Sequence, residues 1–244
     1  MIIQPEENKK QINKELYESI LKYKELVGGR LNMNTIKYLP TGDDTLNSLL
    51  NGGYKKGLLT EINGISDSGK TLLALKAIKE TQKEDKIGIY INTMESINIS
   101  MLKDNDINKD ELIIINMNKA DLLGPLLTDI IKSLINYIGV IVIDNLAGLS
   151  TSKEQKSSIT TNTDIHRSKV IKALLMRIAN LIRNTDIVTI IINELRYDIN
   201  TNTNVATSER WINMCCDTRI KLSLNEDNDI IIDNITFKER KLNK

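Results

Sequence analysis

One short stretch of the chain carries the clearest chemical signal. Residues 64–71 match the pattern G-x-x-x-x-G-K-[ST] of a phosphate-binding loop. Glycines let such a loop wrap closely around phosphate oxygens, and the helix start that follows attracts anions. We expect Lys70 to reach the β- and γ-phosphates and the Thr71 hydroxyl to ligate Mg²⁺. The residues expected to contact the nucleotide are Gly64, Ile65, Ser66, Asp67, Ser68, Gly69, Lys70, Thr71 and Leu72.

A second candidate stands at the end of an apolar run. Residues 139–143 read Gly-Val-Ile-Val-Ile, and Asp144 follows them. This composition is typical of a strand that is buried on both faces. In NTPases with a phosphate loop, an aspartate at such a strand end holds Mg²⁺ through water. The run is a weak signal alone, but together with residues 64–71 it predicts the second half of a nucleotide site.

Hydrolysis also requires a group that positions or deprotonates the attacking water. Glu95 is the candidate, because it comes just after a predicted strand, although an ordinary solvated loop glutamate would look the same. Glu194 is the second candidate and follows another predicted strand. The sequence leaves this choice open.

These candidates need a scaffold that brings strand ends together. From residue 40 onward, strand-like and helix-like segments alternate, which predicts an α/β fold with a mostly parallel central sheet flanked by helices. In such sheets ligands bind at the carboxyl ends of the strands. The predicted strands span residues 58–63, 87–92, 112–116, 139–144 and 187–193. The predicted helices span residues 43–51, 71–83, 119–137 and 166–184.

Two further segments flank this scaffold. Residues 220–224 and 230–237, joined by a polar turn, predict a C-terminal β-hairpin. Residues 6–27 carry apolar side chains at helical spacing and end at Gly28-Gly29. We therefore expect an N-terminal helical arm over residues 1–37 and a nucleotide-binding core over residues 38–244. The arm either packs on its own domain or docks on a neighbouring subunit.

Composition limits the classes of partner. The 244 residues carry a net charge of +1, so the chain is not a globally basic nucleic-acid binder and any DNA contact must be local. No apolar run approaches the ~20 residues of a membrane span, and the N-terminus lacks the features of a signal peptide. The adjacent Cys215 and Cys216 are too few for a disulfide framework. We expect a cytoplasmic protein with no membrane partner.

The order of the motifs adds a resemblance. Pro40-Thr41-Gly42, Gly52-Gly53 and Gly57 lead into the phosphate loop, and residues 90–95, 142–145 and 191–196 follow it. Over roughly residues 38–224 this arrangement resembles the RecA recombinase family, most closely its bacterial and phage branch. The resemblance implies a RecA-like fold and an ATP-dependent protein that forms a filament on single-stranded DNA. Such filaments pair homologous strands and exchange them, with ATP bound between subunits.

The resemblance also implies site residues. The polar segments 150–164 and 197–210 correspond to two DNA-binding loops, with Lys153, Lys156 and Arg196 as the expected DNA contacts. Residues 150–172 carry five basic against two acidic side chains, which supports local phosphate contact. Lys238 and Arg240 fall near a basic pair that reaches across the subunit interface to the γ-phosphate.

Several positions depart from the family pattern. Met94 stands where the catalytic glutamate is expected, Glu95 is one residue late, and Glu194 replaces a glutamine that senses the γ-phosphate. The sequence is also expected to lack the family's C-terminal domain. A diverged member with slow hydrolysis fits these changes. Two alternatives stay open: an ATP-binding polymer with weak or no hydrolysis, and an ATPase of the same fold that acts on a substrate other than DNA.

Overall fold

The structure of this protein is a computed structural model that describes residues 36–154, 161–198 and 203–238. The helix that the sequence predicts over residues 6–27 lies outside the described residues. The division into an arm (residues 1–37) and a core (residues 38–244) therefore stays a prediction.

The core is built on one large sheet. Within the described residues its strand order is β10-β9-β3-β7-β6-β4-β5, with β8 paired onto β7. All neighbouring pairs from β9 to β5 are parallel, and only β10 and β8 run antiparallel to their partners. The predicted α/β fold with a mostly parallel sheet is thus confirmed. The strands are β3 (Leu59–Gly64), β4 (Ile87–Asn92), β5 (Leu112–Asn116), β6 (Ile138–Asp144), β7 (Val188–Asp198), β8 (Thr203–Ala206), β9 (Thr218–Leu224) and β10 (Ile230–Phe237).

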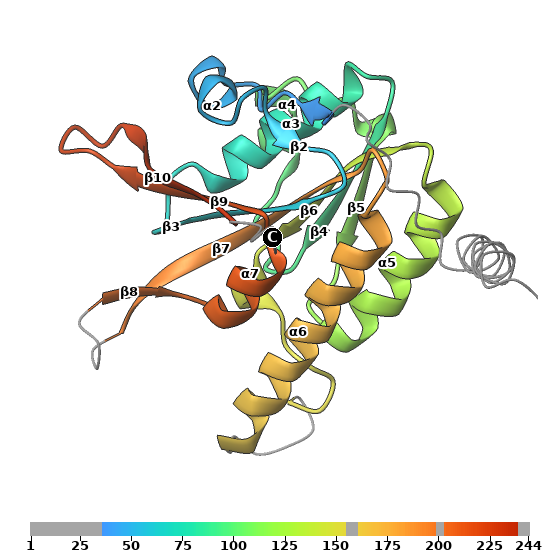
Figure 1. Ribbon diagram of the computed structural model, residues 1–244, viewed down its shortest axis with the longest axis vertical. Coiled ribbons are helices and arrows are strands. Elements are labelled where there is room, and N and C mark those ends of the chain that lie inside the picture. Colours follow the sequence, from blue (N-terminus) through green and yellow to red (C-terminus); the bar gives the residue numbers. More distant parts are fainter. Residues whose placement is uncertain (1–35, 155–160, 199–202, 239–244) are drawn as a thin grey trace, which may run out of the picture. The chain divides into compact units, whose positions relative to one another are not determined.

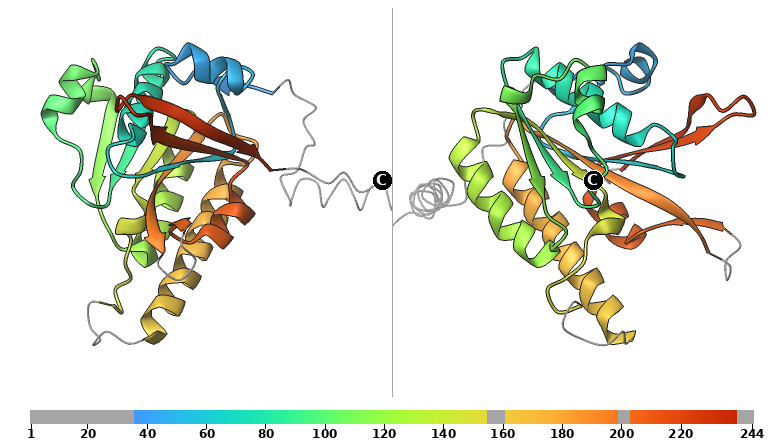
Figure 2. Two further views of the ribbon diagram at one scale, coloured as in Figure 1. Left: turned by 90° about the vertical axis from the view of Figure 1, so that its left-hand side faces the viewer. Right: turned by 180° about the vertical axis from the view of Figure 1, so that it is seen from behind.

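Helices cover both faces of this sheet, as Figure 1 and the turned views of Figure 2 show. One face carries α2 (Asp44–Leu49), α3 (Lys70–Gln82) and α4 (Ile99–Asp104). The other carries α5 (Ala120–Leu134), α6 (Thr161–Ile182) and α7 (Glu209–Cys215). A short ribbon of β1 (Tyr38–Leu39) and β2 (Tyr54–Lys55) precedes the large sheet in sequence, and single turns η1 (Lys109–Glu111) and η2 (Leu146–Gly148) follow α4 and β6.

The central strands bury both of their faces. In β6, Ile141 and Ile143 pack into the layer under α5 and α6, whereas Val140 and Val142 pack into the layer under α3. Successive side chains point to opposite sides of a strand, so a strand with helices on both sides must be apolar throughout. This is why the run before Asp144 could be recognised from the sequence.

The observed elements differ from the expected ones mainly after residue 193. Strand β7 continues to Asp198 and pairs with β8, with Leu195 opposite Ala206, so the segment expected as a polar loop over residues 197–210 contains a strand and the start of α7. Pairing between β7 and β8 forms this ribbon, and the polar composition of residues 197–204 gave no strand signal. Helix α6 also begins at Thr161, five residues before the predicted start.

A buried ion pair ties the middle of the sheet together. The Glu61 side chain on β3 is fully buried, and the Arg219 guanidinium on β9 donates to it over 2.6 Å. Asn63 and Asn193 each donate to the same carboxylate over 2.9 Å. Arg219 also reaches Glu209 on α7 over 3.3 Å. Three strands and one helix therefore meet at Glu61.

We predict that Arg219→Met destabilises the fold by about 3 kcal/mol, because it leaves a buried carboxylate without its cation. The neighbouring Lys221→Met is the control, since its ion pair with Asp233 has side chains that are 46% and 40% exposed and should be worth at most about 1 kcal/mol. Urea unfolding of both variants measures the difference. Equal losses of unfolding free energy would show that the buried Glu61 pair stabilises the fold no more than the exposed pair does.

Candidate functional site

The predicted phosphate loop joins a strand to a helix, as its motif requires. Residues 65–69 connect the end of β3 to the start of α3. A Cβ on Gly64 would lie 2.6 Å from the Leu222 carbonyl oxygen, so this glycine has no room for a side chain. A Cβ on Gly69 would lie 2.5 Å from Ile230 Cδ1, so the end of that side chain would have to move. Gly69 also has a φ of 84°, a conformation that other residues rarely adopt. The loop shape thus depends on both glycines.

Lys70 is the first residue of α3, and its side chain contacts the loop. Its ammonium group donates to the Ile65 carbonyl over 2.5 Å, and the Ser68 hydroxyl donates to the same carbonyl over 2.8 Å. Burial lowers the pKa of Lys70, and the carboxylates of Glu194, Asp144 and Asp67 oppose that shift, Glu194 most strongly. The loop therefore holds one cation among three acidic side chains.

Two hydroxyl groups donate hydrogen bonds to the Asp144 carboxylate. The Thr71 hydroxyl donates to Asp144 Oδ2 over 2.8 Å, and the Tyr90 hydroxyl donates to the same oxygen over 2.5 Å. The Asp144 residue is only 3% exposed, and the described residues offer it no ion pair. A buried carboxylate paired only with neutral donors favours a cation.

This pair fits the expected magnesium. Hydroxyl and carboxylate oxygens are hard ligands, and Mg²⁺ is commonly held by one or two of them together with substrate phosphates. In the part of the chain that the structure describes, no group of three acidic, histidine or cysteine side chains forms an alternative metal site.

Tyr90 was not singled out by the sequence. It occupies a buried position of β4, and burial, followed by the nearby Asp144 charge, raises its pKa far above the usual value. Its hydroxyl therefore stays protonated and donates. The available signal was a tyrosine in an otherwise apolar run, two residues before Asn92 at the strand end.

The two candidates for positioning water occupy different environments. Glu194 is half-buried at the carboxyl edge of the sheet, where it stands opposite Gly64 in the β3–β7 register. Glu95 is exposed, with a φ of 54°, in a turn closed by the Ser96 amide donating to Asn92 Oδ1 over 2.9 Å. Asn92 in turn stands opposite Asp144. Glu194 thus lies within β7, level with the end of β3, rather than after its strand as the sequence predicts, and Glu95 lies just beyond the end of β4.

The predicted DNA contacts are only partly described. Arg196 is exposed on β7, two residues past Glu194, and Lys153 is exposed in the segment after β6. Lys156 lies outside the described residues.

The basic pair near the C-terminus is also only partly described. Lys238 lies far from the phosphate loop of its own chain, because its amide bonds to Asp217 at the opposite end of β9. Its ammonium donates to the Met214 carbonyl. Arg240 lies outside the described residues.

Trp211 belongs to α7, and its side chain contacts α6. Its indole N–H donates to the Ser168 hydroxyl over 2.8 Å, and the Lys172 ammonium is 4.6 Å from the ring centroid. The Arg210 guanidinium is 5.0 Å from the same ring. The side chain therefore connects two helices and carries two cations at its ring.

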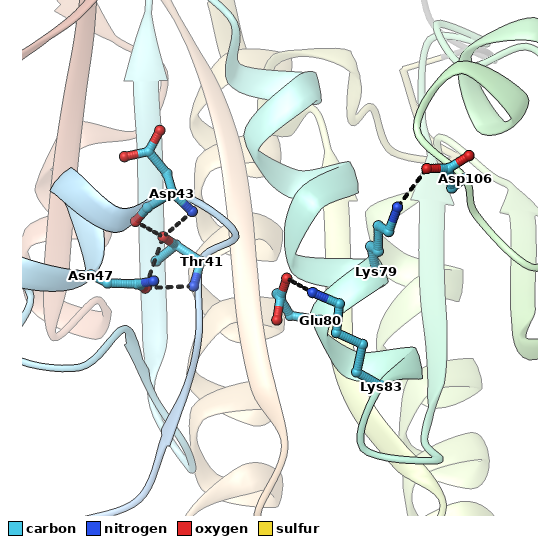
Figure 3. Close-up of polar contacts among 7 residues, drawn as sticks. All are labelled: Thr41, Asp43, Asn47, Lys79, Glu80, Lys83 and Asp106. Atoms are coloured by element: carbon cyan, nitrogen blue, oxygen red, sulfur yellow. Dashed lines mark hydrogen bonds and ion pairs between the residues drawn. The ribbon is translucent and has the colours of Figure 1, made fainter.

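The lead-in to the site is fixed by Thr41. Figure 3 shows that the Thr41 amide and hydroxyl both donate to Asn47 Oδ1 of α2, over 2.7 and 3.0 Å. The Thr41 hydroxyl also accepts from the amide of Asp43, the N-cap of α2, over 3.1 Å. A Cβ on the next residue, Gly42, would lie 2.9 Å from Lys76 Cβ on α3. The Pro40-Thr41-Gly42 segment therefore lies directly against the helix that begins with Lys70.

A cavity of about 450 Å³ lies beside the start of α3, between α2 and the β9–β10 hairpin. Its walls are mostly apolar and include Leu49, Leu72 and Ile231, whereas Lys70 and Asp144 do not line it. The lining also includes Gly69 of the loop and Lys76 of α3, but mostly apolar walls do not suit a phosphate group, so the loop stays the predicted phosphate site.

None of the described helices is long and apolar enough to cross a membrane.

Comparison with known proteins gives a consistent result. A family model described as the RecA N-terminal domain matches residues 6–239. Protein RecA of Gloeobacter violaceus is 31% identical over 176 residues, which cover 70% of this chain and 46% of that protein. Protein RecA of Mesoplasma florum is 28% identical over 189 residues (75% and 56%), and that of Phytoplasma mali is 29% identical over 211 residues (82% and 61%).

The chain spans about half the length of the curated relatives it matches. The family model nevertheless covers most of this chain, in the segment that forms the sheet and the phosphate loop. The chain therefore belongs to the RecA family.

Proposed function

We propose that this protein binds ATP with Mg²⁺, forms a filament on single-stranded DNA and promotes pairing and exchange of homologous strands. The observation that carries the proposal is the meeting of Lys70, Thr71 and Asp144 at one edge of the sheet, with Thr71 and Asp144 joined over 2.8 Å. Family membership supports the DNA part of the proposal.

Residues 64–72 would hold the phosphates of ATP. The Lys70 ammonium donates to the neutral Ile65 carbonyl, and a triphosphate would replace that carbonyl with a charged and therefore stronger partner. Thr71 and Asp144 would hold Mg²⁺, which neutralises phosphate charge when it is bound. Lys238 and Arg240 would act on the γ-phosphate of a neighbouring subunit, which agrees with the distance of Lys238 from its own loop.

A filament also needs contacts between copies. We propose that the arm over residues 1–37 docks on a neighbour.

The buried thiols of Cys215 and Cys216, which form no disulfide, support the proposed cytoplasmic setting.

ATP turnover with and without single-stranded DNA tests the function. We predict turnover that DNA stimulates, and at least about tenfold weaker nucleotide binding in Lys70→Ala, because a charged hydrogen bond is worth about 1.5–3 kcal/mol. Lys79→Ala is the control, since this lysine of the same helix pairs with the exposed Asp106 instead (Figure 3). Turnover that ignores DNA would favour the non-DNA ATPase, and an ATP-dependent polymer without turnover would favour the structural alternative.

We propose Glu95 as the group that positions water, with Glu194 as the alternative. Glu95→Gln should lower turnover about 10²-fold, the size of a general base contribution, and leave ATP binding intact. Single-turnover hydrolysis and equilibrium binding of both variants separate the two. If Glu95→Gln retains its turnover while Glu194→Gln changes it strongly, the base is Glu194.

The DNA contacts predict a salt effect. Replacing Lys153, Lys156 and Arg196 by alanine should lower the slope of log affinity against log salt by about 2, because each phosphate contact on a single strand contributes about 0.7. ATP binding should persist, because none of the three lies in the phosphate loop. Fluorescence anisotropy over a salt series measures the slope, with the exposed Lys103 and Lys109 replaced together as the control. An unchanged slope would remove these residues from the DNA surface.

A further inference from the structure

Tyr90 reaches the proposed magnesium site from the interior of the protein. The residue is fully buried, in the apolar layer that also contains Val142 and Ile78. Its hydroxyl nevertheless donates over 2.5 Å to Asp144 Oδ2, a polar group at the end of the neighbouring strand. The side chain thus spans from the core to the site.

The same carboxylate oxygen has a second donor, Thr71, from the first turn of α3. Two donors that come from separate elements restrict rotation of the carboxylate about its Cβ–Cγ bond. Both bonds fall on Oδ2, and among the described residues no hydrogen bond is made to Oδ1. One oxygen is therefore committed to the protein, and the other remains available to a cation or its bound water.

Burial of a tyrosine does not by itself require such a bond in this protein. Tyr54 is also buried, and its hydroxyl has no hydrogen-bond partner within the described part of the chain. The core thus accommodates one tyrosine whose hydroxyl makes no bond, whereas the hydroxyl of the other is aimed at Asp144. Both tyrosines belong to the same apolar layer and differ in whether the hydroxyl has a hydrogen-bond partner.

We propose that Tyr90 is a positioning residue for magnesium: its hydroxyl holds the Asp144 carboxylate in the orientation that binds the cation. This inference rests on the proposed function, because it assumes that Thr71 and Asp144 hold Mg²⁺. Partners that hydrogen-bond to a metal ligand orient it, and their loss typically costs 10–100-fold in metal affinity.

The test compares Tyr90→Phe with Tyr54→Phe, which each remove one buried hydroxyl and keep the ring. The readout is equilibrium binding of a fluorescent, non-hydrolysable ATP analogue, measured in a Mg²⁺ titration and again in EDTA. For Tyr90→Phe we expect the Mg²⁺ concentration at half-maximal binding to rise about tenfold, with binding in EDTA unchanged. Tyr54→Phe should match the wild type within about twofold in both conditions.

A double-mutant cycle provides the second measurement. In an Asp144→Asn background, Tyr90→Phe should change the Mg²⁺ dependence by less than about twofold, because the group that it orients has lost its charge. Thermal unfolding of every variant reports whether the fold persists.

The outcomes separate the claims. An unchanged Mg²⁺ midpoint in Tyr90→Phe, equal losses in Mg²⁺ and EDTA, or an equal shift in Tyr54→Phe would each overturn the inference while the proposed function stands. A wild-type protein that binds no nucleotide would overturn the proposed function, and the inference with it.

Discussion

The parallel pairing of β3, β7, β6 and β4 determines where chemistry can occur in this protein. The register sets Gly64 opposite Glu194 and Asn92 opposite Asp144, so β3, β4 and β6 end at the same edge, while β7 continues past it to Asp198. A one-residue slip in any strand would turn each of its side chains to the other face. The positions of the site residues therefore depend on the apolar contacts along whole strands that set this register.

Two buried carboxylates in the same sheet show how structural and functional groups differ. Glu61 is satisfied by the Arg219 cation and two amide groups, so its charge is balanced within the fold. Asp144 is satisfied only by the hydroxyls of Thr71 and Tyr90, which supply hydrogen bonds but no positive charge. Glu61 thus stabilises the fold. Asp144 interacts with the Lys70 ammonium only at longer range and has no ion pair among the described residues, so it remains suited to a bound cation.

Much of this arrangement could be predicted from the sequence, because it is encoded by local patterns. The motif at residues 64–71 fixes its own strand, loop and helix, and the apolar run before Asp144 identifies a central strand. Tyr90 could not be predicted, because its partner lies 54 residues away and only the β4–β6 register brings the two together. The β7–β8 ribbon was missed for a related reason, because residues 197–204 are mostly polar and their pairing determines their conformation. Helix α7 was missed because its seven residues are too few to show a helical period. The roles of Glu95 and Glu194 stay predictions, since both lie near the strand ends that carry the site.

The position of Trp211 has a practical consequence. It is the only tryptophan among the 244 residues, so the intrinsic tryptophan emission of the protein comes from one location. That location is the junction of α6 and α7, where the indole is anchored to Ser168 and lies near Lys172 and Arg210. Indole emission is sensitive to nearby charge. The unlabelled protein therefore contains an optical reporter of this helix junction.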